Sequence, residues 1–272
     1  MQEYVMNSRQ ACFACLQRDP PALFEAALWI ATEHDPALRP EPVLRDIGGL
    51  AQQVAAGLPV LPARELGQPL LRLLHDLGLH EEDHLPLRPA AALPHRVLQQ
   101  RRGHPLALAL IALEVARRLE IPLYGVDFPG HLLLRVENAD HLLDPVSGRR
   151  LYSRDCRELL LRQHGAPAEL EGRHLQSCPA HHLLQHLSRL LRQLHEQNDD
   201  PLAALKDAER VLLLGPPSVA DHLARADLYQ RLECPQGERF DLQRALLLCD
   251  DPSERLRLDQ RLRQVEVVDA LH

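Results

Sequence analysis

The sequence predicts a mostly helical α+β protein in two parts, a domain with a small antiparallel sheet and then an all-helical repeat domain. Three observations support this prediction. Leu supplies 58 of the 272 residues, whereas Phe, Trp and Tyr together supply only 9, and this composition favours helices over a β-sandwich. A strand-like stretch follows one strongly apolar helix near the middle of the chain. The C-terminal part repeats with a period of 34 residues.

Length and charge limit the classes of protein that the chain can belong to. A chain of 272 residues suits two domains, and 45% apolar residues exclude global disorder. The net charge of −7 argues against a nucleic-acid-binding or membrane-surface protein. Gly125, Gly130 and Gly148 are spaced as turn residues, not as a phosphate-binding loop, so we expect no cofactor.

The ends and the cysteines indicate a cytoplasmic protein. The first ten residues, MQEYVMNSRQ, lack the apolar core of a signal peptide, and the longest apolar run, residues 105–113, is too short to span a membrane. We therefore expect six thiols rather than disulfides. The Cys12–Cys15 pair has the spacing of a redox or metal motif, but with no second pair it is more typical of two core thiols in a helix.

Apolar periodicity predicts three helices in the first part, over residues 22–34, 65–78 and 104–120. Residues 81–94 contain three prolines and are predicted to form an extended loop. After the third helix the pattern changes to short strands over residues 121–127, 131–137 and 141–145, with a turn at residues 138–140.

The second part is predicted to be a stack of helical repeats. Residues 207–214 match residues 241–248 at an offset of 34, with identity at Asp207 and Asp241 and at Arg210 and Arg244. Leu194, Leu228 and Leu262 follow the same spacing. This is the tetratricopeptide period, although a non-repetitive helical bundle is the alternative. The aperiodic stretch 163–180 suggests domains at residues 1–172 and 173–272.

His131 and Asp144 lie on the strands that follow the helix beginning near residue 104. This order resembles the transglutaminase and papain-like superfamily, in which a Cys begins the helix and a His and an Asp follow on strands. The helix N-terminus stabilises the thiolate, the His accepts its proton, and the carboxylate orients the imidazole. A two-residue turn would place Leu133 opposite Asp144 and bring His131 within reach of Asp144, whereas a turn longer by one residue would separate them.

Residues 101–137 and 142–151 closely resemble the bacterial SirB-type family, in which a transglutaminase-like domain precedes tetratricopeptide repeats. The resemblance covers roughly residues 20–265. The segment before the Arg-Arg-Gly motif departs from the family pattern, which has Tyr and Asn there. The matching positions are Arg101, Arg102, Gly103, Pro105, Pro129, Gly130, His131, Arg135, Asp144, Pro145 and Gly148.

The nucleophile position of the superfamily is occupied by Pro105, which has neither a thiol nor a hydroxyl group. His131 and Asp144 are therefore candidates for a vestigial catalytic pair, and Arg135, Pro105 and Gly130 are candidate binding residues near it. Arg135 could bind an anion, pair with Asp144, or be a solvated strand residue. The His182–His186 pair could bind a metal, but the sequence places no acidic or Cys ligand beside it, so we expect no metal site.

Two functions remain open at this point. The first is a non-catalytic interaction protein, built on a degenerate transglutaminase-like domain, whose repeats bind a protein or peptide. The second is a hydrolase or acyltransferase that uses His131 and Asp144 with a water or with a thiol from elsewhere in the chain. The missing nucleophile favours the first, so we expect no cysteine-dependent acyl-transfer activity.

Overall fold

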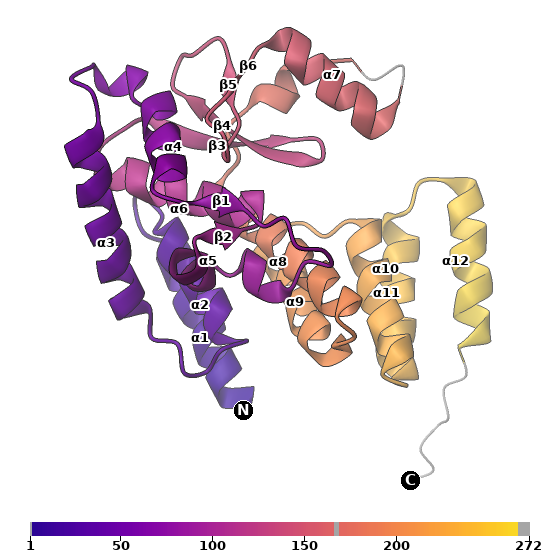
Figure 1. Cartoon of the computed structure of the whole chain (residues 1–272). Helices are drawn as coiled ribbons and strands as arrows, with labels where there is room; N and C mark the ends of the chain where they lie inside the picture. Colours follow the sequence, from indigo (N-terminus) through magenta and orange to yellow (C-terminus); the bar gives the residue numbers. More distant parts are fainter. Residues whose placement is uncertain (1, 166–168, 266–272) are drawn as a thin grey trace. The chain divides into compact units, whose positions relative to one another are not determined.

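The computed structural model describes residues 2–165 and 169–265. The chain divides into two compact units, Met1–Leu187 and Ser188–His272. The first combines helices with small sheets and the second is helical throughout the part described (Figure 1). The predicted fold class is therefore confirmed.

Seven α-helices and three short 3-10 helices are described in the first unit before residue 180. The α-helices are α1 Gln2–Leu16, α2 Leu23–Thr32, α3 Pro40–Gly57, α4 Gly67–Asp76, α5 Pro94–Gln100, α6 Pro105–Arg118 and α7 Ser153–His164. The 3-10 helices are η1 Ala63–Glu65, η2 Pro89–Ala92 and η3 Gly172–Leu175. Helices α2, α4 and α6 confirm the three predicted helices with shorter ends, and η2 and the start of α5 lie in the stretch predicted as an extended loop.

Four antiparallel strands form the main sheet in the order β3-β4-β5-β6. They are β3 Leu123–Phe128, β4 His131–Val136, β5 Leu142–Leu143 and β6 Arg150–Leu151. Gly130 has φ +74° in the turn between β3 and β4, a conformation that glycine adopts without strain. The pairing of Leu134 with Leu143 is the register that a two-residue turn predicts. A second, two-stranded parallel sheet pairs β1 His80–Glu81 with β2 Arg102–Gly103.

Helix α6 is the centre of the first unit. Every residue from Leu106 to Ala116 is buried, and α6 contacts α2, α3, α4, α5 and both long strands of the main sheet. A helix that is apolar on all sides is stable only when other elements enclose it completely. Gly103, just before the start of α6, is also closely packed. A Cβ on Gly103 would lie 2.4 Å from the Val97 side chain.

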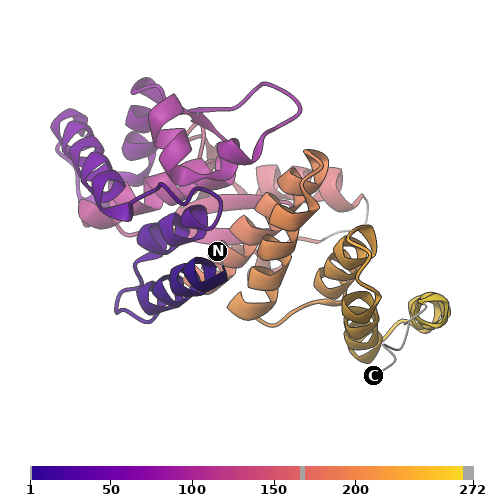
Figure 2. The same ribbon diagram turned by 90° about the horizontal axis from the view of Figure 1, so that it is seen from below.

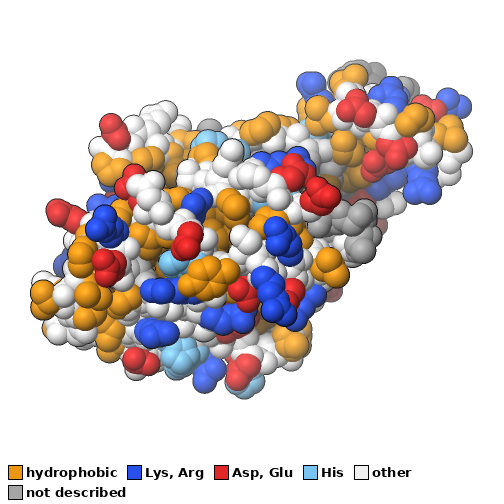
Figure 3. Space-filling view, turned by 90° about the horizontal axis from the view of Figure 1, so that it is seen from above, with side chains coloured by type: hydrophobic (Ala, Val, Ile, Leu, Met, Phe, Trp, Pro, Cys, Tyr) orange, Lys and Arg blue, Asp and Glu red, His pale blue; other side chains and the backbone are white. Residues whose placement is uncertain are grey.

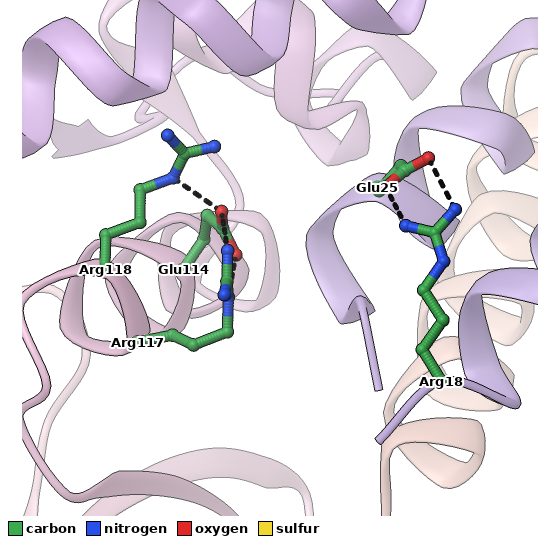
Figure 4. A network of polar contacts seen from close by, with 5 residues as sticks. All are labelled: Arg18, Glu25, Glu114, Arg117 and Arg118. Atoms are coloured by element: carbon green, nitrogen blue, oxygen red, sulfur yellow. Dashed lines mark hydrogen bonds and ion pairs between the residues drawn. The ribbon is translucent and has the colours of Figure 1, made fainter. Parts of the chain in front are cut away.

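The C-terminal end of α6 carries the buried carboxylate of Glu114. Arg117 and Arg118 both bind this carboxylate, at 2.8 Å and 2.6 Å (Figure 4). Arg118 also donates to the carbonyl oxygen of Leu44 in α3. The charges at this end of the helix are therefore paired, and cations at a helix C-terminus are favourable with respect to its dipole.

Four helices of the second unit pack consecutively, α9 against α10, α10 against α11 and α11 against α12 (Figures 1 and 2). They are α9 Pro201–Leu214, α10 Val219–Arg231, α11 Pro235–Leu248 and α12 Pro252–Gln264. Helix α8, Ala180–Gln197, begins in the first unit and ends in the second. Helices α9 and α11 begin 34 residues apart, and the described residues between 181 and 265 contain no strand.

Several of the residues that repeat at this spacing are core residues. Asp207 and Asp241 both have side chains with no exposure, and Leu194 and Leu228 are buried. The two arginines that repeat have different environments. Arg210 is buried against Asp207, whereas Arg244 lies over the ring of Phe240 at 5.3 Å.

On the face shown in Figure 3, acidic and basic side chains are interspersed among the coloured residues. Of the helices that the structure describes, none combines the length and apolar character needed to cross a membrane.

Asp241 provides a test of the packing in the second unit. Its carboxylate accepts hydrogen bonds from Arg225 at 2.7 Å and 2.9 Å and lies 2.8 Å from Nδ1 of His222. Asp241→Ala leaves the buried His222 and the partly buried Arg225 without their partner, so we expect a loss of roughly 3 kcal/mol in the free energy of unfolding, measured by urea denaturation. Asp250→Ala, at an exposed position, is the control and should change it by less than about 0.5 kcal/mol. Equal effects of the two substitutions would contradict this account of the repeat core.

Candidate functional site

The N-terminus of α6 is where the superfamily mechanism needs a nucleophile. His104 is the N-cap residue, and its ring Nδ1 accepts a hydrogen bond from the N–H of Leu106 at 3.1 Å. The carbonyl oxygen of His104 accepts the N–H groups of Ala107 and Leu108. Pro105 has no N–H group. Each N–H of the first turn is therefore already bound within the protein, and none is left to stabilise a thiolate or an oxyanion.

Burial keeps the ring of His104 neutral. It lowers the pKa of His104 from 6.5 to about 4. A neutral ring with Nδ1 as an acceptor carries its proton on Nε2. His104 thus acts as a helix cap at neutral pH, because only the unprotonated Nδ1 can accept the Leu106 N–H.

His131 and Asp144 are placed on neighbouring parts of the sheet but do not interact. His131 is exposed at the start of β4, opposite Phe128. Asp144 Oδ1 accepts the N–H groups of Val146 and Ser147 and the hydroxyl of Ser147, so it caps the turn before β6. No hydrogen bond or ion pair joins the two side chains in the described structure. The contact expected from the sequence is therefore absent, although the register is the expected one.

Gly130 and Arg135 have structural contacts in this region. A Cβ on Gly130 would lie 2.6 Å from the side chain of Gln163 in α7. Arg135 donates two hydrogen bonds to the carbonyl oxygen of Ala139 and one to that of Leu175. Arg135 therefore does not pair with Asp144, and it is half-buried rather than fully solvated. Its guanidinium holds the β4–β5 loop and η3 against the sheet.

The first unit matches a known family. A family model described as the transglutaminase-like superfamily matches residues 41–192, more than half of the chain. UPF0162 protein PA3419 of Pseudomonas aeruginosa is 58% identical over 258 residues, which cover 94% of this chain and 96% of that protein. The chain belongs to the UPF0162 family, within the transglutaminase-like superfamily. A second model, for the tetratricopeptide repeat, matches residues 191–263.

More distant members of the UPF0162 family also match. Protein SirB1 of Salmonella typhimurium is 30% identical over 168 residues, which cover 60% of this chain and 62% of that protein. UPF0162 protein YchA of Escherichia coli is 30% identical over 206 residues, which cover 73% and 76% of the two chains. The resemblance to the SirB-type family, read from the motifs around residues 101–151, is thereby confirmed.

The thiols of this UPF0162 protein are mostly buried. Cys12 and Cys15 are each 1% exposed, and neither forms a disulfide. Burial, reinforced by the Glu25 carboxylate that Arg18 binds (Figure 4), raises the pKa of Cys15 to about 11. Burial also raises the pKa of Cys156. A buried thiol with a raised pKa is a poor nucleophile, so these residues behave as core side chains.

The histidines at the start of α8 contact one another and a carboxylate of β3. The rings of His181 and His182 contact each other at 4.4 Å. His186 instead approaches Asp127 of β3, with Nε2 and Oδ2 3.0 Å apart, and Cys178 lies beside both. Burial, with a contribution from Asp127, raises the pKa of Cys178 to about 12. The sequence pointed to His186 as a possible ligand but not to Asp127, which lies about fifty residues before Cys178 in the chain.

The neutral cap makes the stability of the first unit depend on pH. Since the folded-state pKa of His104 lies below 6.5, the unfolded chain binds a proton that the folded chain excludes. Stability is complete above pH 6.5 and is lost as the pH falls towards 4, by about 3 kcal/mol from this residue. His104→Asn keeps an N-cap acceptor but does not titrate. Urea denaturation between pH 7 and pH 4 should show a shallower loss in this variant, and parallel pH profiles would contradict the assignment.

Proposed function

We propose that this protein is a non-catalytic interaction protein whose tetratricopeptide unit binds a protein or peptide, while its transglutaminase-like unit is a scaffold. The observation that carries the proposal is an apolar stripe on the surface of α11. Phe240 is 49% exposed and Leu247 is 74% exposed. They lie seven residues apart with Arg244 between them, so all three share one helical face.

An exposed stripe of this kind is typical of a binding surface. Single apolar residues are common on protein surfaces, but several at helical spacing on one face are what a partner buries. Phe240 and Arg244 also form a cation–π pair, and aromatic and Arg side chains are enriched among the residues that dominate binding energy. Further exposed apolar residues of the same unit are Leu202, Leu213, Leu248 and Leu256.

The first unit supports the non-catalytic part of the proposal. Pro105 stands where a nucleophile is needed, and the N–H groups that would stabilise an anion are bound by His104. Asp144 is engaged by its own turn rather than by His131. The alternative of a hydrolase that uses this pair gains no supporting contact in the described structure.

The proposal places the protein in a reducing compartment such as the cytoplasm. None of the six cysteines forms a disulfide, and five of them are buried. Such thiols are stable where disulfide formation is disfavoured. The proposed partner is therefore another cytoplasmic protein or peptide, with an apolar surface that complements the α11 stripe.

The stripe can be tested by affinity capture with tagged full-length protein from a lysate of the native organism. The double variant Phe240→Ser, Leu247→Glu removes two anchors, each worth about 2 kcal/mol, and should lower recovery of a stoichiometric partner by more than about tenfold. Val60→Glu, which changes a fully exposed residue of the first unit, is the matched control and should retain the partner. Equal recovery by the double variant, or no enriched protein in any capture, would refute the proposal.

A further inference from the structure

Three side chains that commonly bind metals meet on one face of β3. Asp127 belongs to β3, Cys178 lies just before α8, and His186 lies in the second turn of α8. One ligand atom from each, a carboxylate oxygen, the Sγ and a ring nitrogen, lies within 4.8 Å of the other two. All three residues belong to the first unit, and none belongs to the first turn of α6.

Backbone pairing places Cys178 beside Asp127. The N–H of Cys178 donates to the carbonyl oxygen of Gly125 at 2.8 Å, and Ser177 forms an antiparallel bridge with Val126. Cys178 is therefore opposite Gly125. Since alternate residues of a strand face the same side, Cys178 shares a face of the sheet with Asp127.

Packing of α8 places His186 over the same face. Gly125 allows the close approach, because a Cβ there would lie 3.2 Å from the side chain of Leu183. His186 follows Leu183 by three residues, so it lies on the same side of the helix one turn later. Asp127 follows Gly125 by two residues in the strand. The Leu183–Gly125 contact thus sets up the 3.0 Å approach of His186 to Asp127.

From this geometry we propose that Asp127, Cys178 and His186 form a zinc site with a water molecule as the fourth ligand. One sulfur, one nitrogen and one oxygen donor suit Zn²⁺, whereas Mg²⁺ and Ca²⁺ prefer oxygen alone. Donor atoms around a tetrahedral Zn²⁺ are roughly 3.4–3.6 Å apart, so the observed cluster needs only small side-chain movements.

Charge and access fit a divalent cation. On binding, the Cys178 thiol releases its proton to solvent and coordinates as a thiolate. The thiolate and the Asp127 carboxylate then carry two negative charges, which balance those of Zn²⁺. The Cys178 side is buried, at 9% exposure, while Asp127 and His186 are partly exposed and give the ion a path from solvent. A zinc site here differs from the sequence-based expectation of no metal site.

Zinc titration of chelator-stripped full-length protein, in competition with a fluorescent chelator, tests the proposal. We expect one Zn²⁺ per chain, unaffected by excess Mg²⁺. Loss of a hydrogen-bonding residue behind a metal ligand typically weakens metal binding 10- to 100-fold. Loss of a ligand itself should therefore weaken binding by about 100-fold or more in each of Cys178→Ser, His186→Gln and Asp127→Asn.

Two variants serve as matched controls. His181→Gln changes a neighbouring histidine of the same helix, and Cys234→Ser changes an exposed thiol of the other unit; neither should alter zinc affinity. Co²⁺ in place of Zn²⁺ gives a thiolate-to-metal charge-transfer band. This band should disappear in Cys178→Ser and remain in Cys234→Ser. Zn²⁺ should also raise the Tm of the wild type but not that of Asp127→Asn, whose partly exposed position makes misfolding a poor explanation. The proposal would be overturned if the wild type bound no stoichiometric Zn²⁺, or if the three ligand variants bound it as tightly as the wild type does.

Discussion

Burial of α6 on every side is the constraint on which the transglutaminase-like unit depends. Eleven consecutive residues, Leu106–Ala116, are removed from solvent, so the backbone groups at both ends of the helix need partners inside the protein. His104 provides them at the N-terminus. At the other end, the paired charges of Glu114 and the two arginines hold the helix against α3 (Figure 4).

The same constraint supports the proposal that this end of the fold is not catalytic. An acyl-transfer enzyme needs a nucleophile at the helix start and free N–H groups that stabilise the developing charge. Here the first turn begins with Pro105, and its N–H groups are bound to His104. The same N–H groups can either stabilise the start of the helix or stabilise a nucleophile. In this protein they are bound by His104, which caps the helix.

The sequence predicted the elements that depend on local periodicity. Helix α6 and the repeat of α9 and α11 follow from spacing along the chain, as does the pairing of β4 with β5. Helix α3 was not predicted, because two prolines in its first turn and the Gly48–Gly49 pair weaken the helical pattern. Helix α5 was missed because it begins at the end of a proline-rich stretch.

The side-chain contacts were harder to predict than the elements. The register of the β4–β5 pair is the expected one, yet Asp144 binds the N–H groups of its own turn instead of His131. Competition between a local cap and a cross-strand partner cannot be read from spacing. The Asp127–Cys178–His186 cluster depends on a backbone hydrogen bond between Cys178 and Gly125, which is long-range in sequence and carries no motif.

The central claim, that no residue of the transglutaminase-like unit is an activated nucleophile, is tested most directly by labelling the folded full-length protein. Iodoacetamide for thiols and a fluorophosphonate for hydroxyls would be applied to native and urea-denatured samples, with the rate at each residue measured by mass spectrometry. The account predicts that no residue reacts faster in the native protein than in the denatured chain, because the buried thiols are protonated and the first turn of α6 offers no free N–H group. A residue that reacts faster in the native protein, and whose substitution abolishes turnover of an amide or ester, would contradict it.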